Sequence, residues 1–170
     1  MSLQHRVLKA IGESPMWKVT GKVHTFLYRT TGGRIGHTAG KITNLLLTTK
    51  GRKSGEARTV ALAYMADGED FVIVASNGGA DRHPAWWLNL RHDPHATVEV
   101  GSRKLEVAAR EATPEEHSLL WPALKAVNPF YANYEQITER RIPVVVLHAA
   151  AWRQGFPRIR SLRANASCRA

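Results

Sequence analysis

A short basic segment after an apolar run is the part of this chain best suited to hold an anion. It spans residues 50–58 and reads K-G-R-K-S-G-E-A-R. Gly51 and Gly55 let the backbone turn sharply, and cations beside a hydroxyl commonly bind phosphate or carboxylate. The cations are Lys50, Arg52, Lys53 and Arg58. The segment equally fits an ordinary solvated turn, and it lacks the spacing of a P-loop.

Aromatic residues at two places could border a planar ligand or supply a proton. Trp86 and Trp87 are adjacent, so on a helix at least one must face the core, while the other could offer a stacking surface. Tyr131 and Tyr134 share one face of a segment if it is helical. Such rings are more often packing residues, but a tyrosine beside a pocket is a reasonable proton source.

No pattern in the sequence indicates a metal site or a nucleophilic triad. The eight histidines do not group with a metal-binding spacing, and neither H-E-x-x-H nor G-x-S-x-G occurs. The single cysteine, Cys168, excludes an intrachain disulfide and a cysteine-rich zinc site. We therefore expect no bound metal.

The composition predicts one globular domain with an anionic partner. The chain has 170 residues, which is enough for one domain with a genuine core. A net charge of +10 predicts attraction to nucleic acid, acidic lipid or a polyanionic small molecule. The sequence shows neither a secretory signal nor an apolar run of the ~20 residues that span a bilayer. We therefore expect a cytoplasmic protein.

The elements that must position these residues are mostly short strands joined by hairpins. Asp67-Gly68 and Gly101-Ser102 each lie between two strand-like runs, and Asp-Gly there is a strong hairpin signal. The expected strands cover residues 45–49, 59–65, 71–75, 96–100, 105–109 and 143–147. The pattern predicts an α+β, mainly β, fold: a small antiparallel barrel flanked by helices.

Three helices are expected around this barrel. Ser14-Pro15 opens an amphipathic segment to about residue 30. A short helix follows Pro84 and covers residues 85–90, and a capping box at residues 113–116 opens a helix to about Val127. Pro129 interrupts this last helix.

Four ordered motifs resemble one known family. They read L-L-T-T-K-G-R-K-S-G-E-A-R, V-I-V-A-S-N-G-G-A-D-R-H-P-A-W-W-L-N-L, W-P-x-L with N-P-F-Y-A-N-Y, and R-x-I-P-V-V-V-L, and the resemblance covers roughly residues 44–148. The chain resembles the deazaflavin-dependent nitroreductases and quinone reductases, actinobacterial split β-barrel proteins that use coenzyme F420. The resemblance implies hydride transfer from the reduced deazaflavin to quinones, nitroaromatics or other activated unsaturated compounds.

The resemblance also implies a site. Lys53 and Arg58 would hold the phosphate and carboxylates of F420, with help from the Gly55 backbone N–H. Tyr131 and Tyr134 fall where the family places tyrosines over the substrate, and Ser76 is a further candidate donor. The residues implied along the deazaflavin are Ser76, Asn77, Gly78, Ala85, Trp86 and Asn89.

At three positions the chain departs from the family pattern. Family members often carry proline where Ala61 stands and lysine where Asn77 stands, which bears on cofactor affinity. A family tyrosine is replaced by Asn128, so one substrate-facing ring would be missing.

The chain is expected to divide into three parts. Residues 1–43 would form a helical segment covering the barrel, residues 44–148 the cofactor-binding barrel, and residues 149–170 a basic, weakly ordered tail. Residues 14–30 pair an apolar face with Lys18, Lys22 and Arg29, which suits peripheral contact with an anionic membrane at its inner face. The expected partner is a small-molecule electron acceptor and not nucleic acid, and no oligomeric state is predicted.

Two alternatives to the F420 reductase stay open. A related split barrel could bind FMN instead of F420. The basic surface could also belong to a non-catalytic binder of lipid, haem or nucleic acid, because any polyanion would satisfy the charge.

Overall fold

The apolar run that precedes the basic segment forms a strand with a fully buried centre. A computed structural model describes residues 28, 38–39 and 42–149. Strand β2 (Ile42–Lys50) pairs antiparallel with β3 (Ala57–Asp67) on one side and with β5 (His95–Val100) on the other. Leu45, Leu46 and Leu47 are fully buried, as expected for a strand covered on both faces.

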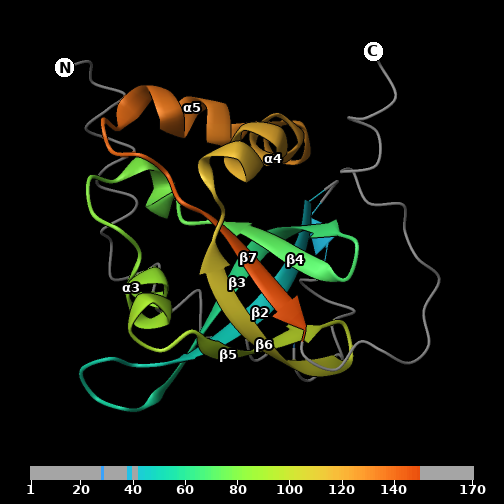
Figure 1. Ribbon diagram of the computed structural model, residues 1–170. Coiled ribbons are helices and arrows are strands. Elements are labelled where there is room, and N and C mark those ends of the chain that lie inside the picture. The colour runs from blue at the N-terminus through green and yellow to red at the C-terminus, as the bar shows by residue number, and fades with distance from the viewer. Residues whose placement is uncertain (1–27, 29–37, 40–41, 150–170) are drawn as a thin grey trace.

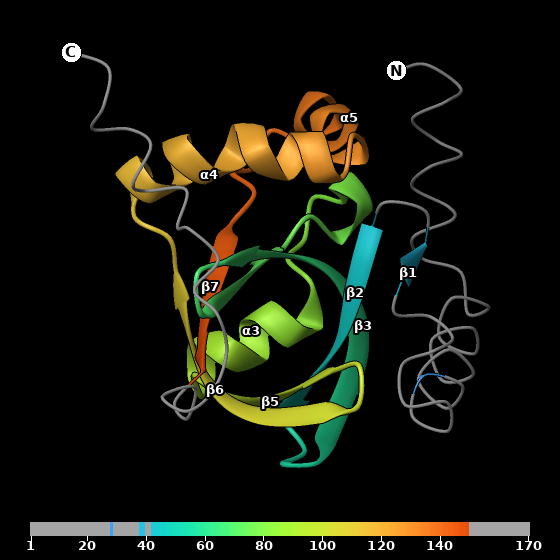
Figure 2. The same ribbon diagram turned by 90° about the vertical axis from the view of Figure 1, so that its right-hand side faces the viewer.

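The strands close into an antiparallel barrel (Figures 1 and 2). The sheet order is β1-β2-β3-β4-β7-β6-β5, and the pairing of β2 with β5 closes the ring. The remaining strands are β1 (Thr38–Ala39), β4 (Asp70–Val74), β6 (Arg103–Glu111) and β7 (Val144–Ala149). This confirms the predicted mainly β, split-barrel fold. Both predicted hairpins form, β3 with β4 and β5 with β6.

Three helices and one 3-10 turn complete the described part of the chain. They are η1 (Asn77–Gly79), α3 (Ala85–His92), α4 (Pro114–Val127) and α5 (Phe130–Ile137). The capping box predicted for α4 is present, because the Thr113 side chain accepts from the Glu116 N–H and the Glu116 carboxylate accepts from the Thr113 N–H. After Pro129 the chain starts a second helix, so α5 carries both tyrosines.

Two hydrophobic cores share the barrel wall. The inner core fills the barrel and is closed by Trp86, Trp87 and Leu90 of α3. The second core lies between the outer face of β4 and β7 and the helices α4 and α5. Alternation along β7 explains both, since Val145 and Leu147 face inward while Val144 and Val146 face the helices.

Tyr28 links β2 to the β5–β6 hairpin at the point where β2 and β5 separate. Their pairing reaches only as far as Leu46 opposite Glu99. The Tyr28 hydroxyl accepts from the Gly101 N–H at 2.9 Å and lies 3.3 Å from the carbonyl oxygens of Asn44 and Glu99. One side chain thus replaces the missing bonds between the strands, and burial raises the pKa of its phenol.

The other sequence predictions for the two ends fall outside the described residues. They concern the amphipathic helix at residues 14–30 apart from Tyr28, most of the segment 1–43, and the tail beyond Ala149. Within the described ranges, no helix is long and apolar enough to cross a membrane. The same ranges hold no cluster of three or more His, Cys, Asp or Glu side chains that could bind a metal ion.

Candidate active site

The basic turn between β2 and β3 has a shape fixed by hydrogen bonds. The Gly51 N–H donates to the Glu56 carbonyl at 2.8 Å, and the Gly55 N–H donates to the Gly51 carbonyl at 2.7 Å. Asn89 of α3 ties this turn to the barrel. Its Oδ1 accepts from the Arg52 N–H at 3.2 Å, and its Nδ2 donates to Thr49 Oγ1 at 3.1 Å. The turn is therefore a rigid platform for its cations.

Lys53 and Arg58 extend from this platform into solvent. The Arg58 side chain is 61% exposed, and its guanidinium lies 2.7 Å from the Glu56 carboxylate. Such an exposed ion pair is worth little, so an incoming anion can compete for the arginine. The Gly55 N–H, which is predicted to help hold the phosphate, donates to the Gly51 carbonyl in this structure.

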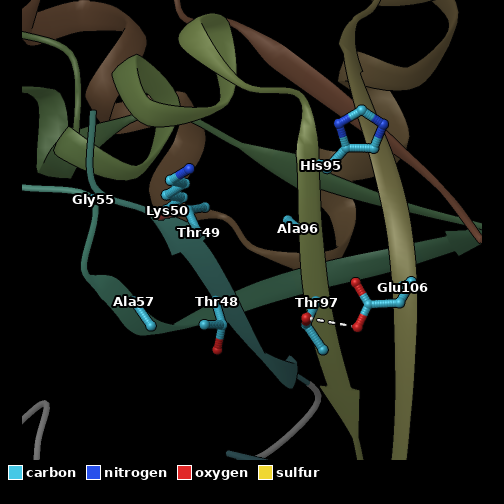
Figure 3. A pocket seen from close by; sticks show the side chains of 9 residues that line it. All are labelled: Thr48, Thr49, Lys50, Gly55, Ala57, His95, Ala96, Thr97 and Glu106. Carbon is cyan, nitrogen blue, oxygen red and sulfur yellow. Dashed lines mark hydrogen bonds between the residues drawn. The ribbon is translucent and has the colours of Figure 1, made fainter.

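A cavity of about 240 Å³ lies beside the turn on the outer barrel face (Figure 3). Its residues come from β2, β5, β6 and the start of β3, and the Thr97 hydroxyl donates to Glu106 Oε1 at 2.9 Å. The lining consists of Thr48, Thr49, Lys50, Gly55, Ala57, His95, Ala96, Thr97 and Glu106. Of the predicted cofactor residues it contains only Gly55. Sequence analysis missed the others because barrel closure alone brings β5 next to β2.

The loop after β4 has an unusual backbone. Asn77, Gly78 and Gly79 have φ angles of 51°, 62° and 77°, all in the left-handed region that favours glycine and tolerates asparagine. A Cβ on Gly79 would lie 2.6 Å from Cγ1 of Ile137 and 3.4 Å from Cδ1 of Tyr134. Gly79 therefore allows the loop to approach α5 closely, which places Ser76, Asn77 and Gly78 beside the tyrosine helix.

Helix α3 connects this loop with the basic turn. Ala85 is exposed in its first turn, whereas Trp86 and Trp87 are 8% and 4% exposed and both belong to the inner core. The two indole rings meet edge to face with centroids 6.5 Å apart. Both tryptophans therefore pack, which leaves Trp86 little surface for stacking on a ligand. Asn89 lies one helical turn after Ala85, and its side-chain amide holds the basic turn between β2 and β3.

The two tyrosines of α5 have different surroundings. Tyr131 is 6% exposed and stacks on Trp121 in the second core, with ring centroids 6.1 Å apart. Tyr134 is half-buried at the edge of that core, against the Gly79 loop. Burial raises the pKa of both phenols, so both stay protonated at neutral pH. Of the two, Tyr134 is the better placed to donate to a ligand.

Arg140 is the first residue of the R-x-I-P-V-V-V-L motif, and no pattern in the sequence predicts a role for it. It lies between α5 and β7, and its guanidinium bonds to the loop after β4. The pKa of this guanidinium is lowered by burial, an effect that Asp81 partly offsets. An arginine carries five N–H donors, and those of Arg140 point at backbone carbonyl oxygens of this loop. Arg140 therefore contributes to the conformation of the loop.

These parts lie along one flank of the barrel. Figure 1 shows α5, the η1 loop, α3 and the β2–β3 turn one below another on the same side. Positive charge lies at the turn and the Tyr134 hydroxyl at the α5 end. Helix α3 and the η1 loop lie between these two ends of the flank. The fold defines a split-barrel protein, and this flank carries both its exposed basic turn and its tyrosine helix.

Comparison with known proteins specifies the family. The family model described as F420H(2)-dependent quinone reductase matches residues 20–149. An F420H(2)-dependent quinone reductase of Mycobacterium tuberculosis (strain ATCC 25618 / H37Rv) is 41% identical over 130 residues, covering 74% of this chain and 87% of the relative. The chain belongs to the F420H(2)-dependent quinone reductase family.

Solved structures agree with this assignment. A structure of an F420-H2 dependent reductase is 36% identical with a TM-score of 0.58, covering 62% of this chain and 93% of that one. Another, described as a domain-swapped dimer, is 33% identical with a TM-score of 0.61, covering 79% and 100%. The chain is accordingly an F420-dependent oxidoreductase, which confirms the enzyme class and the cofactor predicted from the motifs.

Proposed function

We propose that this chain reduces a quinone-type acceptor on the flank formed by the β2–β3 turn, α3, the η1 loop and α5. The observation that carries the proposal is the arrangement of that flank, with exposed cations on a rigid turn at one end and a protonated phenol at the other. Family membership supplies the cofactor and the acceptor class.

The residues of the turn fit the anionic part of F420. Lys53 and Arg58 are exposed, and the turn that carries them is tied to α3 through the hydrogen bonds of Asn89. Lysine and arginine bind phosphate and carboxylate by charge-assisted hydrogen bonds. We therefore assign the phosphate and carboxylates to Lys53 and Arg58.

The other end of the flank suits the ring system and the acceptor. Reduced F420, when bound, supplies the hydride. The loop with Ser76, Asn77 and Gly78 provides the edge against which a flat ring can lie, and Ala85 leaves space beside it because its side chain is small. These residues orient the reactants and exclude water.

Reduction of a quinone also requires a proton or a strong hydrogen-bond donor. Tyr134 lies beside the η1 loop and keeps its proton, because burial raises the pKa of its phenol. Ser76 is the second candidate, with a side chain in the same loop. Tyr131 is less suitable because its ring is packed between α4 and α5. We assign the donor role to Tyr134.

Cofactor choice tests the proposal directly, with FMN as the competing ligand. Purified protein is expected to bind F420 far more tightly than FMN in a fluorescence titration. Raising the ionic strength from about 0.05 M to about 0.5 M should weaken F420 binding, because salt screens the ion pairs at the turn. Equal or tighter binding of FMN would contradict the proposal and indicate that the protein uses FMN.

Contact with a membrane is a further part of the proposal. Quinones are apolar, and residues 14–30 pair an apolar face with Lys18, Lys22 and Arg29. Each basic residue contributes about 1 kcal/mol near an anionic surface, so attachment should be reversible and salt-sensitive. We expect the protein to co-sediment with acidic vesicles and not with neutral ones.

The basic tail is the control for this experiment. A chain ending at His148 lacks the arginines of the tail but keeps residues 14–30. Binding by both chains would support the role of residues 14–30. Binding by the full chain alone would assign the contact to the tail, and binding by neither at low salt would contradict membrane contact.

A further inference from the structure

The loop that follows β4 combines an unfavourable backbone conformation with a small number of internal hydrogen bonds. Its three consecutive left-handed residues are Asn77, Gly78 and Gly79. Such a conformation costs a non-glycine residue about 1–2 kcal/mol. Within the loop, the Gly79 N–H donates to the Ser76 carbonyl at 3.0 Å and the Ala80 N–H to the Asn77 carbonyl at 3.2 Å. The Asn77 Nδ2 also donates to the Arg82 carbonyl at 3.0 Å. Contacts from outside the loop add to these three bonds and hold the residues at both of its ends.

Arg140 makes those contacts at both ends of the loop. Its Nη2 donates to the Ser76 carbonyl at 2.5 Å and to the Ala75 carbonyl at 3.2 Å. Its Nε donates to the Ala80 carbonyl at 2.8 Å. One planar guanidinium thereby spans the residues on either side of the left-handed turn, by bonds that are strong because the donor is charged.

The same guanidinium sets the tautomer of His83. Its Nη1 lies 3.3 Å from Nδ1 of His83. Arginine can only donate, so Nδ1 must accept and the imidazole proton must sit on Nε2. Burial, and then the charges of Arg140 and Arg91, lower the pKa of His83, which favours the neutral ring. The clamp thus reaches from Ala75 to His83, just before α3 begins.

Arg140 is itself fixed to the helix that carries Tyr134. It stands three residues after the last residue of α5, and the Ile137 side chain of α5 contacts Gly79. On its other side, the Pro143 carbonyl accepts from the Ala75 N–H at 2.9 Å. The arginine therefore joins the loop to α5 and to the start of β7.

We propose that Arg140 is a positioning residue for hydride transfer, which holds the loop of Ser76, Asn77 and Gly78 in register with Tyr134. The inference rests on the proposed function, since it requires the cofactor ring at this loop and the donor on α5. Chemistry that depends on the distance between bound groups is sensitive to shifts of about 1 Å, so a loosened loop lowers the rate even when binding persists. Lysine cannot replace the arginine, because its single ammonium cannot reach carbonyl oxygens on both ends of the loop.

The test compares Arg140→Lys and Arg140→Gln with the matched controls Arg141→Lys and Arg141→Gln. Arg141 is the next residue and is exposed, so its variants make the same chemical change outside the clamp. The first measurement is hydrogen–deuterium exchange of the cofactor-free protein. We expect residues 75–83 to exchange about tenfold faster or more in the Arg140 variants, with the barrel strands and both controls unchanged.

The second measurement separates binding from chemistry. In the Arg140 variants kcat for quinone reduction should fall about tenfold or more, while the Kd for F420 should change by less than about threefold. The kcat is taken per folded enzyme, which removes any loss of stability. Arg140→Lys keeps the charge, so it stays informative even where Arg140→Gln does not fold.

Two results would overturn the inference. If residues 75–83 of Arg140→Lys exchange as slowly as those of the wild type, the loop does not depend on the several N–H donors of the guanidinium. Faster exchange with an unchanged kcat would show that the clamp is structural only. Failure of the proposed function has another signature. In that case the wild-type protein does not bind F420, whereas the exchange experiment still reports on the clamp because it uses the cofactor-free protein.

Discussion

Replacing Lys53 and Arg58 together by alanine is expected to weaken F420 binding by about a hundredfold or more. Each charge-assisted hydrogen bond contributes roughly 1.5–3 kcal/mol, which corresponds to about tenfold to a hundredfold in affinity for each single variant. Fluorescence titration of F420 into the two single variants and the double variant measures these losses. The salt dependence of binding should shrink in parallel, because the screened ion pairs are gone.

The fold should tolerate both substitutions. Arg58 forms an exposed ion pair with Glu56. The turn itself is held by Asn89 and by hydrogen bonds of its own backbone. Lys104→Ala is the matched control, since Lys104 is an exposed lysine on β6 and lies outside the predicted site. A collapse of the melting temperature in Lys53→Ala or Arg58→Ala would make these residues structural and contradict the assignment. Wild-type affinity in the double variant would move the anion site elsewhere.

Tyr134→Phe is expected to slow quinone reduction by about tenfold or more while F420 affinity barely changes, because donors in the transition state commonly contribute at least this much. The variant keeps the ring that packs at the edge of the second core and removes only the hydroxyl. The rate is measured as a single turnover of quinone reduction by enzyme loaded with reduced F420. The Kd for F420 is measured separately. Burial raises the pKa of this phenol from its ordinary value, so the hydroxyl keeps its proton at neutral pH. This donor should therefore cause no loss of rate between about pH 6 and pH 9.

Tyr131→Phe is the matched control on the same helix. Its ring stacks on Trp121, and its hydroxyl is hydrogen-bonded to the side chain of Asn128. The substitution should cost about 1 kcal/mol of stability and leave the rate near that of the wild type. A slow Tyr131→Phe beside a normal Tyr134→Phe would reverse the assignment, and normal rates in both would reduce the two tyrosines to packing.

Much of the fold follows from local patterns in the sequence. Asp67-Gly68 and Gly101 favour tight turns, so the two hairpins form wherever the neighbouring runs can pair. The capping box at Thr113 starts α4 because it satisfies backbone N–H groups that the helix leaves open. The basic turn at residues 50–58 is equally local, since its glycines and cations are adjacent in the chain. These features depend on neighbouring residues and could be predicted without the tertiary structure.

The tertiary structure decided what surrounds each predicted site residue. Tyr131 and Tyr134 look equivalent in the sequence, yet one is packed on Trp121 and the other lies at the η1 loop. Asn89 is predicted to complete the pocket, and in the structure its amide holds the turn 37 residues earlier in the chain. Arg140 reaches carbonyl oxygens 60 to 65 residues away. Contacts of this kind depend on how a closed barrel brings distant segments together, and no local pattern in the chain encodes them.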